Sequence, residues 1–122
     1  MFEDISNQLK AQLDQLSEKQ IHLLQTEFPG LPNDYLSFIK RVGFGNIGEI
    51  QIYSGPISPD EVYPHVKELG SIILFGDDHQ GYCFGFDLID EYRVVEVDPN
   101  GLPDRSIEPD FLSLILGYFN QN

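Results

Sequence analysis

The spacing of hydrophobic positions changes near residue 49 of this 122-residue chain and changes back near its end. In the first part, apolar residues recur three and four positions apart, which places them on one face of an α-helix. Between residues 49 and 97, most apolar residues alternate with polar ones or form short continuous runs, which is typical of strands. The pattern therefore predicts helices first, then a sheet, then one closing helix.

Two helices are predicted before Pro29. The first carries an apolar stripe of Ile5, Leu9, Leu13 and Leu16. The second begins at "SEKQ", residues 17–20, which fits a capping box because Ser17 can accept from the Gln20 amide while Gln20 reaches back. Its buried side is expected to carry Ile21, Leu24 and Phe28.

Two further helices have a stronger apolar repeat. "LPNDYLSFIKRV" places Pro32 in a first turn, with a stripe of Tyr35, Phe38, Ile39 and Val42. "EPDFLSLILGYF", near the end of the chain, has Pro109 suited to the first helical position. Its predicted buried stripe is Phe111, Leu114, Ile115 and Tyr118.

The middle of the chain predicts strands joined by short connections. The candidates are "EIQIY", "SIILF", "YCFGFDL" and "YRVVEV", and the second, at residues 71–75, is apolar throughout and suits a central strand. Connections as short as "DDHQG" and "IDE" favour antiparallel hairpins. Between the first and the second of these strands, "SPDEVYPHVKEL" predicts a short helix with Ser58 as N-cap and Pro59 in its first turn.

The predicted fold class is therefore α+β. We expect one domain over residues 1–122, with N-terminal helices and a C-terminal helix packed on a mixed, mainly antiparallel sheet.

A formal net charge of −13 limits the partners of the protein. Residues 1–48 hold 6 acidic and 4 basic side chains, whereas residues 49–122 hold 14 acidic and 3 basic ones. Such a charge disfavours nucleic acid and anionic membranes, because both are themselves negatively charged. The first residues lack a signal-peptide pattern and no segment has the length of an apolar membrane span, so the expected location is the cytoplasm.

Gly43, Gly45 and Gly48 have the G-x-G-x-x-G spacing of dinucleotide-binding loops. That fingerprint needs a strand before the glycines and a helix after them. Here a predicted helix precedes them and a predicted strand follows. We therefore expect Gly43 to cap the helix in a left-handed conformation and the segment to turn the chain into the sheet. A small nucleotide-binding protein or enzyme is the weakest alternative.

No other pattern predicts catalysis, a metal or a cofactor. Cys83 is the single cysteine, which excludes an intramolecular disulfide, and it is expected to be a small buried residue. Asp77, Asp78 and His79 are adjacent, and adjacent side chains of an extended segment point apart, so a hairpin turn is expected there instead of a metal site. The protein is not expected to be an enzyme.

Four segments together resemble the SUKH superfamily of cell-wall assembly regulators and bacterial immunity proteins. They are Leu31, Pro32, Tyr35 and Phe38 in the third predicted helix; the three glycines after it; Gly76, Asp77, Gly81 and Asp87; and Phe111, Leu114 and Ile115. The resemblance extends from about Ser17 to the end of the chain. Where many members have Asn-Gly-Gly, this chain has Val42-Gly43-Phe44.

The resemblance implies a protein-binding domain instead of an enzyme. Bacterial members of the family typically bind a polymorphic toxin, often a nuclease, and protect the producing cell. An acidic inhibitor suits a basic nuclease, because opposite charges speed association. We therefore expect a bacterial immunity protein whose partner is a toxin C-terminal domain. The alternative is a regulatory or scaffold module without a toxin, and the sequence does not determine the oligomeric state.

The predicted partner surface comes from the strands and hairpin ends of the acidic half. It consists of acidic residues with two tyrosines as aromatic anchors: Asp77, Asp78, Tyr82, Asp87, Asp90, Glu91, Tyr92, Glu96 and Asp98.

Overall fold

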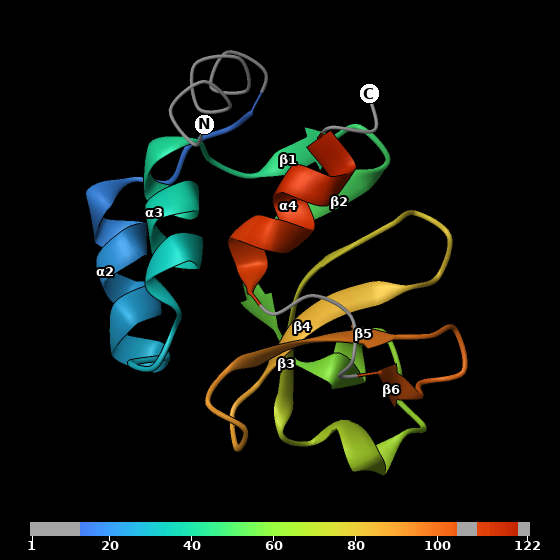
Figure 1. Ribbon diagram of the computed structural model, residues 1–122. Coiled ribbons are helices and arrows are strands. Elements are labelled where there is room, and N and C mark those ends of the chain that lie inside the picture. Colours follow the sequence, from blue (N-terminus) through green and yellow to red (C-terminus); the bar gives the residue numbers. More distant parts are fainter. Residues whose placement is uncertain (1–12, 105–109, 120–122) are drawn as a thin grey trace.

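The computed structural model describes residues 13–104 and 110–119 (Figure 1). Most of the predicted opening helix lies outside the described residues, as does Pro109. The described end of that helix, from Leu13 to Leu16, is not helical. Asp14 instead exchanges two backbone hydrogen bonds with Phe44, at 3.0 and 2.8 Å. The apolar periodicity was misleading at this end, because a pairing with a distant segment decides its conformation.

The helices confirm three of the sequence predictions. They are α2 (Glu18–Glu27), α3 (Asn33–Arg41) and α4 (Phe111–Phe119). The capping box before α2 is present, with the Ser17 amide donating to Gln20 Oε1 at 2.8 Å and the Gln20 amide to Ser17 Oγ at 3.2 Å. Pro32 is the N-cap of α3 instead of its first helical residue.

Asp34 joins α3 to α4. Its Oδ1 accepts from the Tyr35 amide at 2.8 Å, and its Oδ2 accepts from the Leu112 amide at 2.9 Å. The first amides of a helix lack partners within the helix, so this carboxylate satisfies one at the start of each helix. It thereby fixes the two helix N-termini side by side.

The sheet is a six-stranded meander in which the strands follow chain order and every neighbouring pair is antiparallel. This confirms the α+β class and the predicted hairpins. The strands are β1 (Gly45–Ile47), β2 (Ile50–Ile57), β3 (Ile72–Asp77), β4 (Cys83–Asp87), β5 (Arg93–Val97) and β6 (Pro103–Asp104). Two short edge strands, β1 and β6, are additional to the predicted ones.

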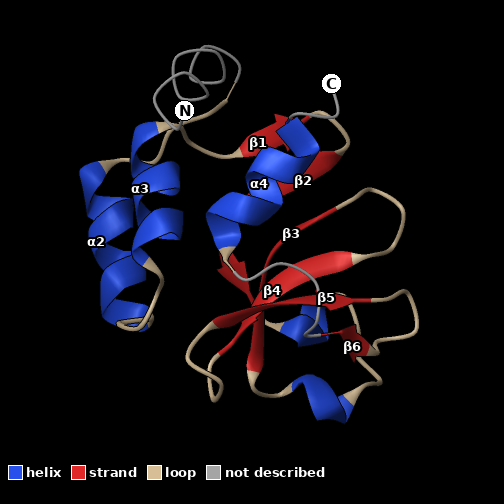
Figure 2. Ribbon diagram, viewed as in Figure 1, coloured by secondary structure: helices blue, strands red, loops and turns tan. Residues whose placement is uncertain are grey.

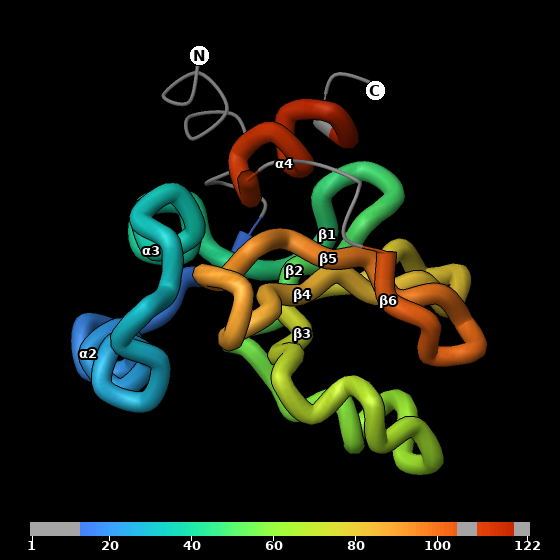
Figure 3. The backbone as a smooth tube through the Cα atoms, turned by 60° about the horizontal axis from the view of Figure 1, so that its bottom comes forward, coloured from blue at the N-terminus to red at the C-terminus, as the bar shows by residue number. Residues whose placement is uncertain are grey.

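The strands β3 and β4 occupy the centre of the sheet, and both of its faces are covered (Figures 2 and 3). Ile73 and Phe75 face the larger core, which contains residues of α2, α3 and α4. Ile72 and Leu74 face a smaller core that includes Tyr63 and residues near it. Strand side chains alternate between faces, so a strand covered on both sides must be apolar throughout. The central position predicted for residues 71–75 is therefore confirmed.

The segment before β3 covers the second face with two 3-10 helices instead of one short α-helix. They are η1 (Pro59–Glu61) and η2 (Lys67–Leu69). Ser58 caps η1 as predicted, with its Oγ accepting from the Asp60 amide at 3.3 Å. The helix ends after one turn, which is consistent with Pro64, since proline lacks the amide that helix continuation needs.

Candidate functional site

The glycine segment has the geometry of a chain reversal. The carbonyl end of α3 precedes it and strand β1 follows, which is the reverse of the strand-then-helix order that a phosphate-binding glycine loop needs. Gly43 has φ +118°, and a Cβ on it would lie 2.1 Å from the Asp14 carbonyl oxygen. Gly48, with φ +60°, is the first residue of the two-residue turn joining β1 to β2, where type II′ turns take glycine. The segment is therefore a helix end followed by a hairpin.

The predicted partner residues are divided between the two ends of the sheet. Successive hairpins of a meander point to opposite ends, and the five-residue strands β4 and β5 separate those ends by about 15 Å. One group lies at the end that carries the β3–β4 and β5–β6 loops: Asp77, Asp78, Tyr82, Glu96 and Asp98. The other lies at the β4–β5 loop: Asp87, Asp90, Glu91 and Tyr92. Figure 1 shows the β3–β4 loop between the β1–β2 hairpin and the β5–β6 loop.

The loops 78–82 and 98–102 have the same pattern of aspartate hydrogen bonds, although their second residues differ: His79 has a positive φ of 63°, and Pro99 is fixed at a negative φ by its ring. In each, an aspartate Oδ1 accepts from the amides two and four residues later: Asp78 from Gln80 and Tyr82, at 2.8 and 3.1 Å, and Asp98 from Asn100 and Leu102, at 2.8 and 3.0 Å. Each loop has a glycine of positive φ at its fourth position, Gly81 at +99° and Gly101 at +83°. Asp78 and Asp98 are therefore fixed by their own loops.

The same two loops pack against each other. A Cβ on Gly81 would lie 3.1 Å from Pro99 Cγ, so the two backbones approach closely at this point. The Tyr63 hydroxyl lies 3.2 Å from the carbonyl oxygens of both Gly81 and Val97. Gly101 in turn fits against Val66, whose Cγ2 would lie 2.6 Å from an added Cβ. The two loops therefore contact each other and, through Tyr63 and Val66, the segment between β2 and β3.

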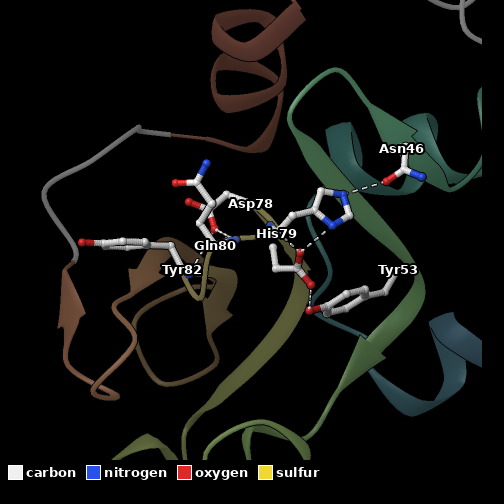
Figure 4. A network of polar contacts seen from close by, with 7 residues as sticks. Asn46, Tyr53, Asp78, His79, Gln80 and Tyr82 are labelled. Carbon is white, nitrogen blue, oxygen red and sulfur yellow. Dashed lines mark hydrogen bonds and ion pairs between the residues drawn. The ribbon is translucent and has the colours of Figure 1, made fainter.

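A polar network joins the first of these loops to the β1–β2 hairpin (Figure 4). The Tyr53 hydroxyl donates to Asp77 Oδ2 at 2.6 Å, and the His79 amide donates to Asp77 Oδ1 at 2.9 Å. His79 Nε2 lies 2.8 Å from Asn46 Oδ1, and its Nδ1 lies 3.8 Å from Asp77 Oδ1. Figure 4 shows His79 and Tyr82 pointing away from the loop in different directions. Asp77, with its carboxylate bound on both oxygens, has a structural role in this network.

Cys83 lies buried beside this network, as predicted. Burial raises the pKa of the Cys83 thiol, and the hydroxyls of Tyr63 and Tyr53 oppose that shift only in part. Burial likewise raises the pKa of Tyr53 and Tyr63. A thiol needs a lowered pKa to act as a nucleophile near neutral pH. Cys83 therefore behaves as a core residue.

Glu96 lies half-buried on the same sheet face as Phe84, which is its register partner on β4. Its other neighbour, Asp104 on β6, places a second carboxylate directly opposite. Burial first, and then the negative charges of Asp104 and Asp78, raise the pKa of Glu96 above its ordinary value of 4.5. The ionised side chain is held in surroundings that disfavour its charge.

Glu96→Gln is expected to raise the thermal unfolding midpoint at pH 7 and to leave it nearly unchanged near pH 4. A carboxyl pKa that is higher in the folded state costs stability only where the group is ionised, so the cost is absent below 4.5 and is complete above the folded-state pKa. Thermal unfolding of both proteins from pH 4 to pH 8 measures the difference. Glu68→Gln, at an exposed position on η2, is the matched control. Equal midpoints at pH 7 would contradict the expected result.

The end of the sheet that carries the β4–β5 loop exposes fewer of the predicted partner residues. Asp87 is buried, with 2% of its surface exposed, and its Oδ1 accepts from the Ile89 amide at 3.3 Å, so it is not available to a partner. Tyr92 is partly buried, packs against the larger core and lies 6.3 Å from Phe86 between ring centroids. Asp90 and Glu91 are exposed. Glu91 and Tyr92 both have positive φ, 55° and 57°, a conformation that costs energy in residues with side chains.

The sequence did not predict a role for Leu102, although a signal for one was present. Leu102 is 63% exposed and closes the second loop as Tyr82 closes the first. The repeat of Asp-x-x-Gly at residues 78–81 and 98–101 is visible in the sequence, and it marks two loops with the same aspartate hydrogen bonds. Side-by-side packing of those loops depends on the strand order and not on either motif alone.

Within residues 13–104 and 110–119, no group of three or more histidine, cysteine, aspartate or glutamate side chains is arranged to hold a metal ion. None of the helices in that described part has the length and apolar character needed to cross a membrane. Comparison with protein-family models, with curated proteins and with solved structures found no match. The resemblance to the SUKH superfamily stays a prediction.

Proposed function

We propose that this protein is an immunity protein that binds and neutralises a basic toxin domain, and that it acts by binding and not by catalysis. The cell compartment in which it would meet such a toxin is the cytoplasm. The observation that carries the proposal is the acidic, preformed loop end of the sheet. Asp78 and Asp98 stand there in two loops that contact each other, with Glu96 near Asp78 and Asp104.

The charge distribution supports a basic partner. Residues 76–104, all of which the structure describes, contain eight acidic side chains and one arginine. That arginine, Arg93, is the first residue of β5 and so lies at the end of the strand away from the loops 78–82 and 98–102. An acidic surface of this kind raises the association rate with a basic protein. Nuclease toxins carry basic surfaces because they bind phosphate backbones.

The test is co-expression with a toxin domain encoded beside the gene for this chain. Cells producing the toxin alone are expected to stop growing, and cells that also produce this protein are expected to grow. An inactivated toxin domain should co-purify with the protein as a stable complex. An unrelated toxin of equal basicity is the control, because protection against it would indicate nonspecific charge binding.

Three outcomes separate the alternatives. Neither protection nor a complex would contradict the immunity function. A stable complex with a neighbouring protein that is not toxic would favour the regulatory scaffold. A thermal shift on adding nucleotides or divalent cations would favour a nucleotide-binding protein or enzyme instead.

A further inference from the structure

Two exposed apolar side chains lie at the end of the sheet that carries the loops 78–82 and 98–102. Tyr82 is 39% exposed and Leu102 is 63% exposed, and each is the last residue of its loop. Continuing the pairing of β4 with β5 and of β5 with β6 by one residue places Asp98 opposite both Tyr82 and Leu102. Asp98 therefore lies between them, and the Tyr82 and Leu102 backbones are about 10 Å apart. The two side chains are therefore close enough to enter a single partner surface.

These side chains extend on the side of the sheet that carries α4. Cys83, which follows Tyr82, and Val97, which precedes Asp98, belong to the smaller core on the other face. Because side chains alternate along a strand, Tyr82, Asp98 and Leu102 are directed to the opposite face. Glu96 shares this face, since it lies opposite Phe84, a member of the larger core.

Carboxylates lie beside and between the two apolar side chains. Asp78 is hydrogen-bonded to the Tyr82 amide, Asp98 lies between the two loops' last residues, and Glu96 lies two residues before Asp98 on the same face. We define Asp78, Tyr82, Glu96, Asp98 and Leu102 as the paired-loop surface. Aromatic and aliphatic anchors next to charged side chains are a usual combination in protein interfaces.

Contacts within the chain itself hold the backbone of this surface in place. The aspartate caps, the Gly81–Pro99 contact and the Tyr63 hydroxyl hold both loops. A rigid surface loses less conformational entropy on binding than a flexible one. The raised pKa of Glu96 also means that a nearby cation would relieve an existing electrostatic cost.

We propose that the paired-loop surface is the docking site for a basic protein, in which Tyr82 and Leu102 enter apolar recesses and lysine or arginine side chains face Asp78, Glu96 and Asp98. This inference rests on the proposed function insofar as the basic protein is taken to be the toxin domain. A second copy of this chain is disfavoured as the occupant, because two such acidic surfaces repel each other.

Site-specific photocrosslinking tests the location. The photoreactive amino acid p-benzoylphenylalanine is placed at position 82, 102 or 89 of the full chain in the native host. Ile89 is the matched control, because it is 84% exposed and is followed by Asp90 and Glu91, but lies at the opposite end of the sheet. Positions 82 and 102 are expected to give the same cross-linked protein, rich in lysine and arginine, and position 89 is expected to give none.

Binding of the purified cross-linked protein then tests the mechanism. Leu102→Glu is expected to weaken its binding at least tenfold in calorimetry, and Ile89→Glu less than twofold, with both variants retaining the thermal midpoint of the parent. Products at position 89 alone, no product at 82 and 102, or a partner without excess basic residues would overturn the proposal.

The outcomes also separate this inference from the proposed function. Full protection from the toxin by a variant carrying both Tyr82→Lys and Leu102→Glu would overturn the docking site while the immunity function stands. A basic partner captured at positions 82 and 102 that does not harm cells would refute the immunity function while the docking site stands.

Discussion

Gly43→Ala is expected to lower the free energy of unfolding by about 3 kcal/mol, because two costs add at this residue. Its φ of +118° is a conformation that alanine adopts only under strain. The added Cβ would also lie 2.1 Å from the Asp14 carbonyl oxygen, which belongs to the backbone pairing with Phe44. Urea unfolding followed by circular dichroism measures the change.

Gly117→Ala is the matched control for this prediction. Gly117 lies within α4, its φ is not in the left-handed region, and nothing lies within 4 Å of an added Cβ. Because alanine favours helix over glycine, this change is expected to stabilise the protein by roughly 0.5–1 kcal/mol. If Gly43→Ala unfolded at the same urea concentration as the parent but lost partner binding, the glycine segment would be a functional site and not a structural turn.

Phe111→Ala is expected to be the most destabilising of the changes considered, at about 4 kcal/mol. Phe111 is fully buried, and its ring centroid lies 5.1 Å from those of both Tyr35 and Phe75 and 5.3 Å from that of Phe38. These edge-on contacts join α4 to α3 and to the central strand β3. Truncating the ring removes apolar burial and leaves a cavity at the point where the three elements meet.

Leu23→Ala is the control for Phe111→Ala, since Leu23 is a large apolar residue that is 55% exposed on α2. Its change is expected to stay within about 0.5 kcal/mol. Equilibrium urea unfolding of both variants gives the comparison. A cost below about 1 kcal/mol for Phe111→Ala would mean that α4 is held mainly by other contacts, such as the hydrogen bond from the Leu112 amide to Asp34.

Local signals in the sequence were sufficient for most elements. The capping box at Ser17 predicted the start of α2, because both of its hydrogen bonds lie within four residues. The continuous apolar run of β3 predicted a central strand, because only a strand covered on both faces requires it. Strand β1 was missed, since Gly45 and Asn46 have low strand propensity and the strand exists through its pairing with β2.

The candidate site was predicted only in part, and for a geometric reason. The sequence indicated an acidic half and named residues on its strands and hairpin ends, and strand alternation already meant that they could not all share one face. It did not show which residues lie at which end of the sheet. In the structure Asp87 is buried, and Asp90 and Glu91 lie at the other end of the sheet from Asp78 and Asp98. Leu102 was not predicted at all, because a single exposed leucine has no meaning until its neighbours are known.

The sequence by itself determined the class of the fold, the positions of most helices and strands, and the strongly acidic character of the second half. These properties depend on residue type and on spacing over a few positions, so they are readable along the chain. The tertiary structure alone decided that Asp14 pairs with Phe44 and that the loops of Tyr82 and Leu102 pack side by side. Both results depend on which distant segments become neighbours, and that is settled by the packing of the whole core.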